Sequence, residues 1–265
     1  MKKSKAGIAI LLLLMVAFGG MCYILFGMEN DPFGPEAVAV NQPQIGVKSQ
    51  PQTDADVLEA LDYELSQNRD TVGWLKIPGT KINNSVLQSY DNVTYLRQDE
   101  RRKYNLYGCY FADYECSFGN RDKLSPNTII YGHSDLTNDP DGPRFSELFR
   151  FMDEDFARNT PVISFVTQDD WMEWEIFAVA EFTTDPRLIQ PSPDSGIAEL
   201  AASVKGKSFH DYDVQVKNSD HILTLITCTD EPTIRLVVMA RLLDPEAEIP
   251  AAAPISSSTE SEQEA

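Results

Sequence analysis

The chain has 265 residues and a formal net charge of -19, with 42% hydrophobic and 24% charged residues, as in ordinary globular proteins. Nucleic acid is excluded as an expected partner, because a polyanion requires a basic surface. The four cysteines, at positions 22, 109, 116 and 228, are too few and too unevenly spaced for a disulfide scaffold or a zinc site.

The first residues predict a membrane anchor. A basic end, residues 1–5, precedes residues 6–28, which carry no charge and would span roughly 35 Å as a helix at about 1.5 Å per residue. The basic end should stay in the cytoplasm, which predicts a single-pass protein of the cell membrane with its main domain on the extracytoplasmic side. A cleaved signal peptide is the alternative, but Phe18–Met28 lacks a run of small residues. Lipoprotein cleavage before Cys22 is disfavoured by the bulky Met21.

Composition divides the rest of the chain into three parts. Residues 29–52 are rich in Pro, Gln, Gly and Val and predict an extracytoplasmic linker. Residues 244–265 consist mostly of Pro, Ala, Ser and Glu, which predicts a disordered acidic tail. One domain, residues 53–243, remains between them.

This domain is predicted to begin with a helix. Thr53 or Asp54 can cap it, and its apolar stripe is Val57, Leu58, Leu61 and Leu65. Two later segments, Ser146–Met152 and Ser195–Val204, also have a helical pattern.

The remaining elements are predicted strands, and the fold class is mainly β. Gly, Pro, Asn and Asp separate the β-rich runs. These runs are Val72–Ile77, Lys81–Leu87, Tyr107–Phe111, Thr128–Tyr131, Val162–Val166, Trp174–Phe182, Ile222–Thr227 and Ile234–Leu242. Eight strands with few helices indicate a closed or nearly closed barrel, which removes exposed strand edges.

Three reactive residue types lie at strand ends. His133 follows one apolar run across a glycine, Cys228 ends another, and Arg235 begins the next strand. If the last two strands pair antiparallel, Cys228 and Arg235 face each other across about 5 Å. Of the other two histidines, His221 lies roughly 23 Å along an extended run from Cys228, and nothing in the sequence places His210 near it. His133 is therefore the best partner for the thiol.

These residue types suit nucleophilic catalysis. The thiolate of Cys228 is the nucleophile, and the imidazole of His133 can stabilise it or protonate a departing amine. Arg235 stays charged and can hold substrate carbonyls or an oxyanion, together with the backbone N–H of Thr229. A structural interpretation also exists, because a cysteine after an apolar strand is often a small core residue.

Three blocks of the sequence carry a family resemblance. They are TLITC at Thr224–Cys228 with RLVV at Arg235–Val238, NTIIYGH at Asn127–His133, and GWLKIPGT at Gly73–Thr80 with the pattern of Val86–Leu96. Over residues 54–243 the chain resembles the sortases, the transpeptidases that attach surface proteins to the wall of Gram-positive bacteria, and is most similar to class B.

The resemblance implies an eight-stranded sortase barrel, with the predicted helix Ser195–Val204 in the long loop between strands 6 and 7. It also implies the catalytic residues His133, Cys228 and Arg235, and we take Thr227 as substrate-binding. The implied partners are sorting-signal peptides of the L-P-x-T-G or N-P-x-T-x kind, cleaved after Thr through a thioacyl-enzyme. An amine of a peptidoglycan precursor or a pilin would then accept the acyl group.

Some features depart from class B. The Thr229–Ile234 connection is shorter than class B members commonly have, and Ile226 and Ser85 stand where Ser and Pro are frequent, so subclass and motif preference stay open. Cys109 is expected to be a buried free thiol, with a local disulfide as the alternative. The acidic segment Asp135–Gly142 lacks a full calcium-loop pattern, and neither a metal nor another cofactor is expected.

Two rival functions remain on the same residues. The first is a hydrolytic cysteine peptidase, which would release peptides to water. The second is a non-catalytic exported barrel that binds other molecules.

Overall fold

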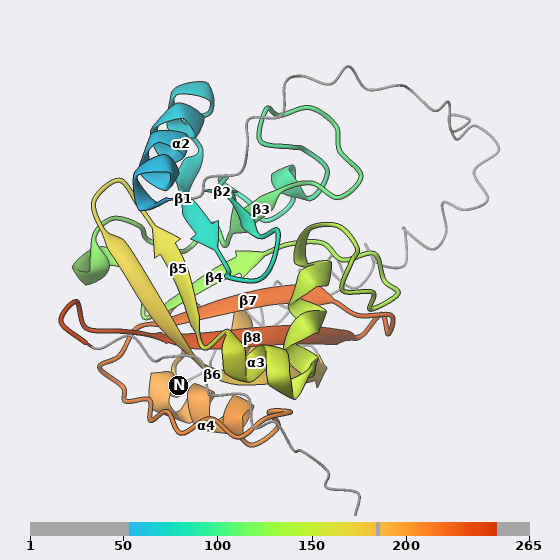
Figure 1. The fold of residues 1–265 in the computed structure, drawn as a ribbon, viewed down its shortest axis with the longest axis vertical. Coiled ribbons are helices and arrows are strands. Elements are labelled where there is room, and N and C mark those ends of the chain that lie inside the picture. Colours follow the sequence, from blue (N-terminus) through green and yellow to red (C-terminus); the bar gives the residue numbers. More distant parts are fainter. Residues whose placement is uncertain (1–52, 184–185, 248–265) are drawn as a thin grey trace, which may run out of the picture.

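The computed structural model describes residues 53–183 and 186–247, which form a closed β-barrel flanked by helices (Figure 1). The strands are β1 Thr71–Lys76, β2 Asn83–Leu87, β3 Tyr110–Ala112, β4 Asn127–Tyr131, β5 Val162–Val166, β6 Trp171–Thr183, β7 Ile222–Cys228 and β8 Ile234–Leu242. The α-helices are α2 Asp54–Gln67, α3 Glu154–Asn159 and α4 Ile197–Lys205. The 3-10 helices are η2 Thr94–Leu96, η3 Arg121–Lys123, η4 Arg144–Met152 and η5 Pro186–Ile189.

The barrel closes in the order β1-β2-β3-β4-β7-β8-β6-β5. Two of its strand pairs are parallel, β2 with β3 and β4 with β7, and the others are antiparallel. The predicted barrel is confirmed, and each of the eight predicted runs contains a strand. The predicted helix between strands 6 and 7 is confirmed as α4, while Ser146–Met152 lies within the 3-10 helix η4.

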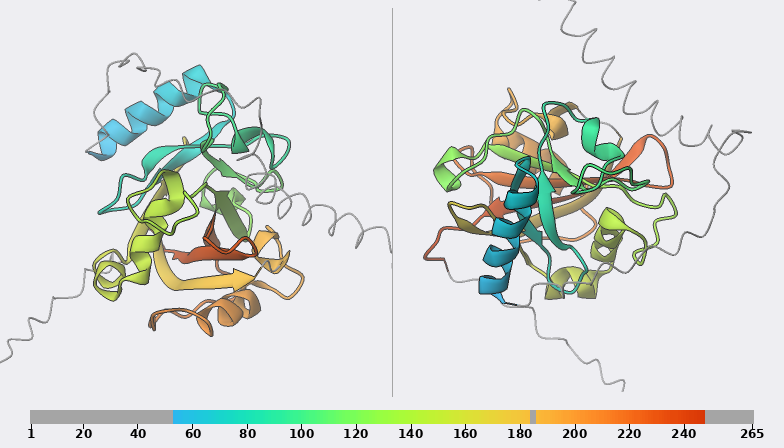
Figure 2. Two further views of the ribbon diagram at one scale, coloured as in Figure 1. Left: turned by 90° about the vertical axis from the view of Figure 1, so that its right-hand side faces the viewer. Right: turned by 90° about the horizontal axis from the view of Figure 1, so that it is seen from above.

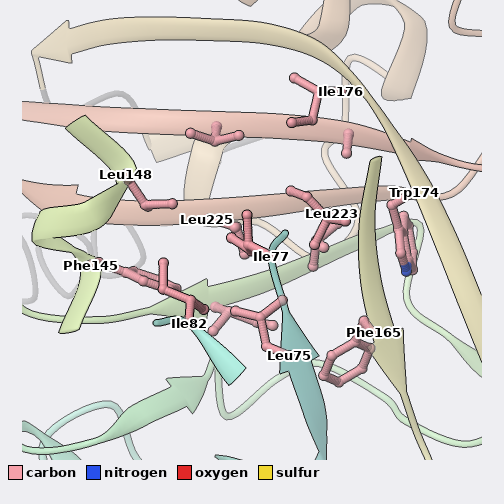
Figure 3. Packing of buried hydrophobic residues seen from close by; sticks show 14 of the residues in the cluster. Leu75, Ile77, Ile82, Phe145, Leu148, Phe165, Trp174, Ile176, Leu223 and Leu225 are labelled. Carbon is pink, nitrogen blue, oxygen red and sulfur yellow. The ribbon is translucent and has the colours of Figure 1, made fainter. Parts of the chain in front are cut away.

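Two apolar clusters lie on the two faces of the barrel wall. Along β7, Leu223 and Leu225 belong to the larger cluster, whereas Ile222 and Ile226 belong to the second one, because side chains alternate along a strand. Leu225 packs near Ile77, Ile82 and Leu148 in the larger cluster (Figure 3). The central strands are therefore buried on both faces, which makes their position rigid.

The helices cover the barrel on opposite sides. α2 lies along one side and α4 along the other (Figure 2). α4 buries Ile197, Leu200, Ala201 and Val204 in the second apolar cluster, which it shares with β6.

The cap of α2 was predicted and its apolar stripe was partly wrong. Thr53 caps the helix, with Asp56 N donating to Thr53 Oγ1 at 3.2 Å and Thr53 N donating to the Asp56 carboxylate at 2.9 Å. Val57 and Leu61 are buried against β1 and β5, but Leu58 is 46% exposed. Neighbouring helical residues point about 100° apart, so Val57 and Leu58 cannot both face the barrel.

The predicted location in the cell membrane requires correction. In residues 53–183 and 186–247, no helix is long and apolar enough to cross a bilayer. The segment 6–28, on which that prediction depended, lies outside the described residues, as do the predicted basic end, linker and most of the predicted acidic tail.

Candidate active site

The pairing of β4 with β7 brings His133 to Cys228. These strands run parallel with Tyr131 beside Ile226, and Gly132 N donates to Ile226 O at 3.2 Å. Because His133 and Cys228 each lie two residues beyond this last pair, they leave the barrel side by side at one rim.

The hairpin of β7 and β8 brings Arg235 to the same rim. Cys228 and Arg235 are directly opposite in the antiparallel register, as the strand arrangement predicted. Arg235 is 4% exposed, and its Nη1 donates to the carbonyls of Pro232 at 2.9 Å and Ile234 at 2.7 Å. The guanidinium therefore has a fixed position that braces the connection between the two strands.

Two residues of the β2–β3 connection hold the imidazole of His133. Its Nε2 lies 2.9 Å from the carbonyl oxygen of Leu96 and 3.1 Å from Nη1 of Arg97. A carbonyl only accepts and a guanidinium only donates, so one nitrogen cannot satisfy both contacts. Arg97 Nη1 has the carbonyls of Leu96 and Leu106 as acceptors. We therefore assign the proton of Nε2 to Leu96 and the lone pair to Nδ1.

His133 is uncharged at neutral pH. Burial, followed by the nearby Arg97 guanidinium, lowers the pKa of His133 to about 4 from an ordinary value of 6.5. The hydrogen bond to Leu96 opposes this shift, and Arg144 adds a smaller repulsion. A neutral imidazole with a free lone pair can accept a proton from a thiol.

Thr227 and Thr229 flank the thiol and have buried side chains. Thr227 is 2% exposed, and its hydroxyl donates to Gly132 O at 2.8 Å, which ties β7 to the chain entering His133. Thr229 is 1% exposed, and its hydroxyl donates to Glu231 O at 3.2 Å. The substrate contact of Thr227 and the oxyanion contact of the Thr229 backbone stay predictions.

The other histidines and cysteines have structural contacts away from this rim. The ring of His210 contacts Phe151 O at 2.7 Å, and the ring of His221 contacts Ser125 O at 3.0 Å. Cys109 and Cys116 are buried free thiols, so the expected free state of Cys109 is confirmed. Burial raises the pKa of both thiols, to about 12 for Cys116, so neither is reactive at neutral pH.

Sequence reasoning missed the residues that orient this site. Leu96 and Arg97 contact His133 from a loop, and Ser134 Oγ donates to the carbonyl oxygen of Cys228 at 2.7 Å. Asn138 contacts Asp230 in the connection after Cys228. Ser134 directly follows the Gly-His pair, but no spacing in the sequence links it to Cys228.

The geometry agrees with comparisons to known proteins. A model of the family described as Sortase domain matches residues 75–243. The chain belongs to the sortase family. This sortase is 36% identical over 181 residues to Sortase B of Listeria monocytogenes, covering 66% of this chain and 71% of the relative. It is 32% identical, with the same coverage, to Sortase B of Staphylococcus aureus.

Solved class B sortases are also its structural neighbours. A Staphylococcus aureus sortase B–substrate complex has a TM-score of 0.61 and 30% identity, covering 70% of this sortase and 85% of that chain. Sortase B from Listeria monocytogenes has a TM-score of 0.58 and 35% identity, covering 68% of this sortase and 98% of that chain.

Proposed function

We propose that this sortase is a cysteine transpeptidase with Cys228 as nucleophile, His133 as its proton acceptor and donor, and Arg235 as the cation that holds substrate or oxyanion. The observation that carries this proposal is the register of three strands. It brings an imidazole that is neutral at pH 7, a partly exposed thiol and a buried guanidinium to one barrel rim. Membership in the sortase family supports the same chemistry.

The first half of the reaction forms a thioester. The thiol of Cys228 transfers its proton to Nδ1 of His133, and Sγ attacks the carbonyl carbon of Thr in the sorting motif. The resulting oxyanion is stabilised by the backbone N–H of Thr229 and by Arg235. When the intermediate collapses, the C–N bond breaks, and the departing amine takes the proton from His133.

The second half transfers the acyl group to an amine. The acceptor nitrogen attacks the thioester carbon and gives its proton to His133, which returns it to the sulfur as the C–S bond breaks. The acceptor class we propose is an amine of a peptidoglycan precursor or a pilin. A solved sortase B is complexed with triglycine, which supports a peptide amine near such a thiol.

The donor we propose is a sorting-signal peptide of the L-P-x-T-G or N-P-x-T-x kind. A related Staphylococcus aureus sortase B has been solved as a substrate complex, which supports peptide binding at this fold. The motif preference of this sortase is a matter for direct measurement.

The test uses the full 265-residue chain and a panel of peptides carrying both motif kinds. Intact-mass spectrometry should detect a thioacyl adduct, and peptide mapping should locate it at Cys228. The adduct should disappear on addition of triglycine, with an amide product of matching mass. Cys228→Ala should form no adduct, and His133→Ala should form it much more slowly.

Matched variants separate catalysis from general damage. His221→Ala removes another histidine with a backbone contact, and Cys116→Ser removes another thiol, and both should keep adduct formation. Release of free acid with no amide product at high triglycine would indicate the hydrolytic peptidase instead. The absence of any adduct across the panel would contradict the transpeptidase proposal.

A further inference from the structure

The loop that follows His133 contacts the loop that follows Cys228. We infer that Ser134 and Asn138 are positioning residues that set the backbone of Cys228, Thr229 and Asp230 for oxyanion stabilisation. This inference rests on the proposed function and adds residues to it that the trio does not include.

Ser134 controls the peptide group that carries the proposed oxyanion donor. Its hydroxyl donates to the carbonyl oxygen of Cys228 at 2.7 Å, and Ser134 is only 4% exposed. The carbonyl of Cys228 and the N–H of Thr229 belong to one planar trans peptide, so they point in opposite directions. A bond that fixes the carbonyl therefore fixes the direction of the Thr229 N–H.

Asn138 controls the next peptide group. Its side-chain oxygen accepts from Asp230 N at 2.9 Å, and its side-chain nitrogen donates to Asp230 Oδ1 at 2.7 Å. Asp230 is exposed, and an exposed loop residue without such contacts would move readily. The pair of bonds holds both the backbone and the side chain of Asp230.

The loop of residues 134–144 is itself rigid enough to act as a brace. Phe145 N donates to His133 O at 2.8 Å, which closes the base of the loop. Within it, Asp135 N donates to Ser146 Oγ at 3.1 Å, and Thr137 N donates to Asp135 Oδ1 at 3.0 Å. These contacts explain how a loop can hold a neighbour in place.

Backbone strain points to the same loop. Four non-glycine residues in the described part of the chain have positive φ, and three of them, Leu136, Asn138 and Arg144, lie here. Such conformations cost energy for residues with a Cβ and are retained where the surrounding structure fixes them, often at functional sites. At Asn138, the left-handed backbone belongs to the residue that contacts Asp230.

The test compares two reactions of the same thiol in the full chain. Thioacylation by a sorting peptide needs the oxyanion donor, whereas alkylation by iodoacetamide is a displacement at a saturated carbon and does not. Ser134→Ala should lower kcat for peptide cleavage about tenfold with little change in KM, because the donor acts mainly in the transition state. The alkylation rate of Cys228 should stay within about twofold of the wild type.

Three further variants sharpen the test. Ser134→Thr keeps the hydroxyl and should restore most of kcat. Asn138→Asp puts a carboxylate against that of Asp230 and should lower kcat without a change in alkylation. It is on the surface, so it serves if Ser134→Ala does not fold. Thr137→Ala, in the same loop and without contact to the Cys228 connection, should match the wild type.

The possible results are distinct. A wild-type kcat in both Ser134→Ala and Asn138→Asp, or an equal fall in cleavage and alkylation, would overturn the positioning role while leaving the proposed function intact. A wild-type protein that alkylates but cleaves no peptide would contradict the proposed function, and this inference with it.

Discussion

Two loops leave the same rim of the barrel, and they differ in length, exposure and internal bonding. Residues 134–144 follow His133, are closed at their base and carry several side-chain bonds to their own backbone. Residues 229–233 follow Cys228, and all but Thr229 are exposed. The short loop carries the proposed oxyanion donor, and the long loop supplies bonds that hold it.

The difference shows how the work of building the site is divided. The strands decide which residues meet, because register alone brings His133, Cys228 and Arg235 to one rim. The loops decide how these residues act, because they set the protonation state of the imidazole and the direction of a backbone N–H. Each prediction below breaks one of these contributions.

The largest effect is expected from Arg235→Lys. Lysine keeps the charge but replaces a planar fork with one ammonium, which cannot both donate to the carbonyls of Pro232 and Ile234 and hold substrate. We expect kcat/KM for peptide cleavage to fall about a hundredfold or more, measured by steady-state assay. Arg241→Lys is the matched control, since it also pairs on β8 but with Glu175. An Arg235→Lys enzyme within threefold of the wild type would contradict the role of Arg235.

The second effect is a pH dependence of stability from His133. Its pKa in the folded state is about 4, below the ordinary 6.5, so the unfolded chain binds a proton more readily between these values. Folding stability from this group is complete above pH 6.5 and is lost as the pH falls towards 4. The loss should be at most roughly 3 kcal/mol.

Urea unfolding between pH 4 and 7 measures this contribution. Because carboxylates titrate in the same range, the informative quantity is the difference between the wild type and His133→Gln. That difference should shrink as the pH falls. A constant difference would show that His133 is not held neutral.

The third effect tests the base of the long loop. A Cβ on Gly132 would lie 2.6 Å from Cδ2 of Phe145, inside the packed interior. Gly132→Ala should therefore lower the free energy of unfolding by about 1–3 kcal/mol. Gly206→Ala is the matched control, because its Cβ would have 3.5 Å to the nearest atom, and it should leave stability unchanged or slightly higher. Equal stabilities would show that Phe145 can move aside.

The smallest effect is expected from Arg97→Gln. Removing the guanidinium removes the repulsion that disfavours a charged imidazole, so the pKa of His133 should rise from about 4 towards its ordinary value. NMR titration of the imidazole measures this directly. An unchanged pKa would mean that burial alone sets the protonation state.

The sequence predicted the strands well because each one shows as an apolar run bounded by turn residues. The same runs were sufficient to predict that Cys228 lies opposite Arg235. The helix cap at Thr53 also depends on local chemistry and was predicted. The exposure of Leu58 was not, because the choice of helix face depends on how α2 docks on the barrel.

The orienting contacts could not be predicted because they join residues far apart in the chain. Leu96 and His133 are 37 positions apart, and Ser134 and Cys228 are 94 apart. Short polar residues in loops carry no periodic signal, and their partners depend on the path of the backbone. The neutral state of His133 likewise follows from a loop that covers it, and a lone histidine in a sequence does not reveal that cover.

The most direct test of the account is a crystal structure of the full chain trapped with a sorting-motif peptide that ends in an aldehyde at Thr. Cys228 Sγ should be bonded to the former aldehyde carbon, and its oxygen should lie about 3 Å from the backbone nitrogen of Thr229. The Ser134 bond to Cys228 O should remain in place. An adduct at another cysteine, or an oxygen turned away from Thr229, would contradict the proposed site.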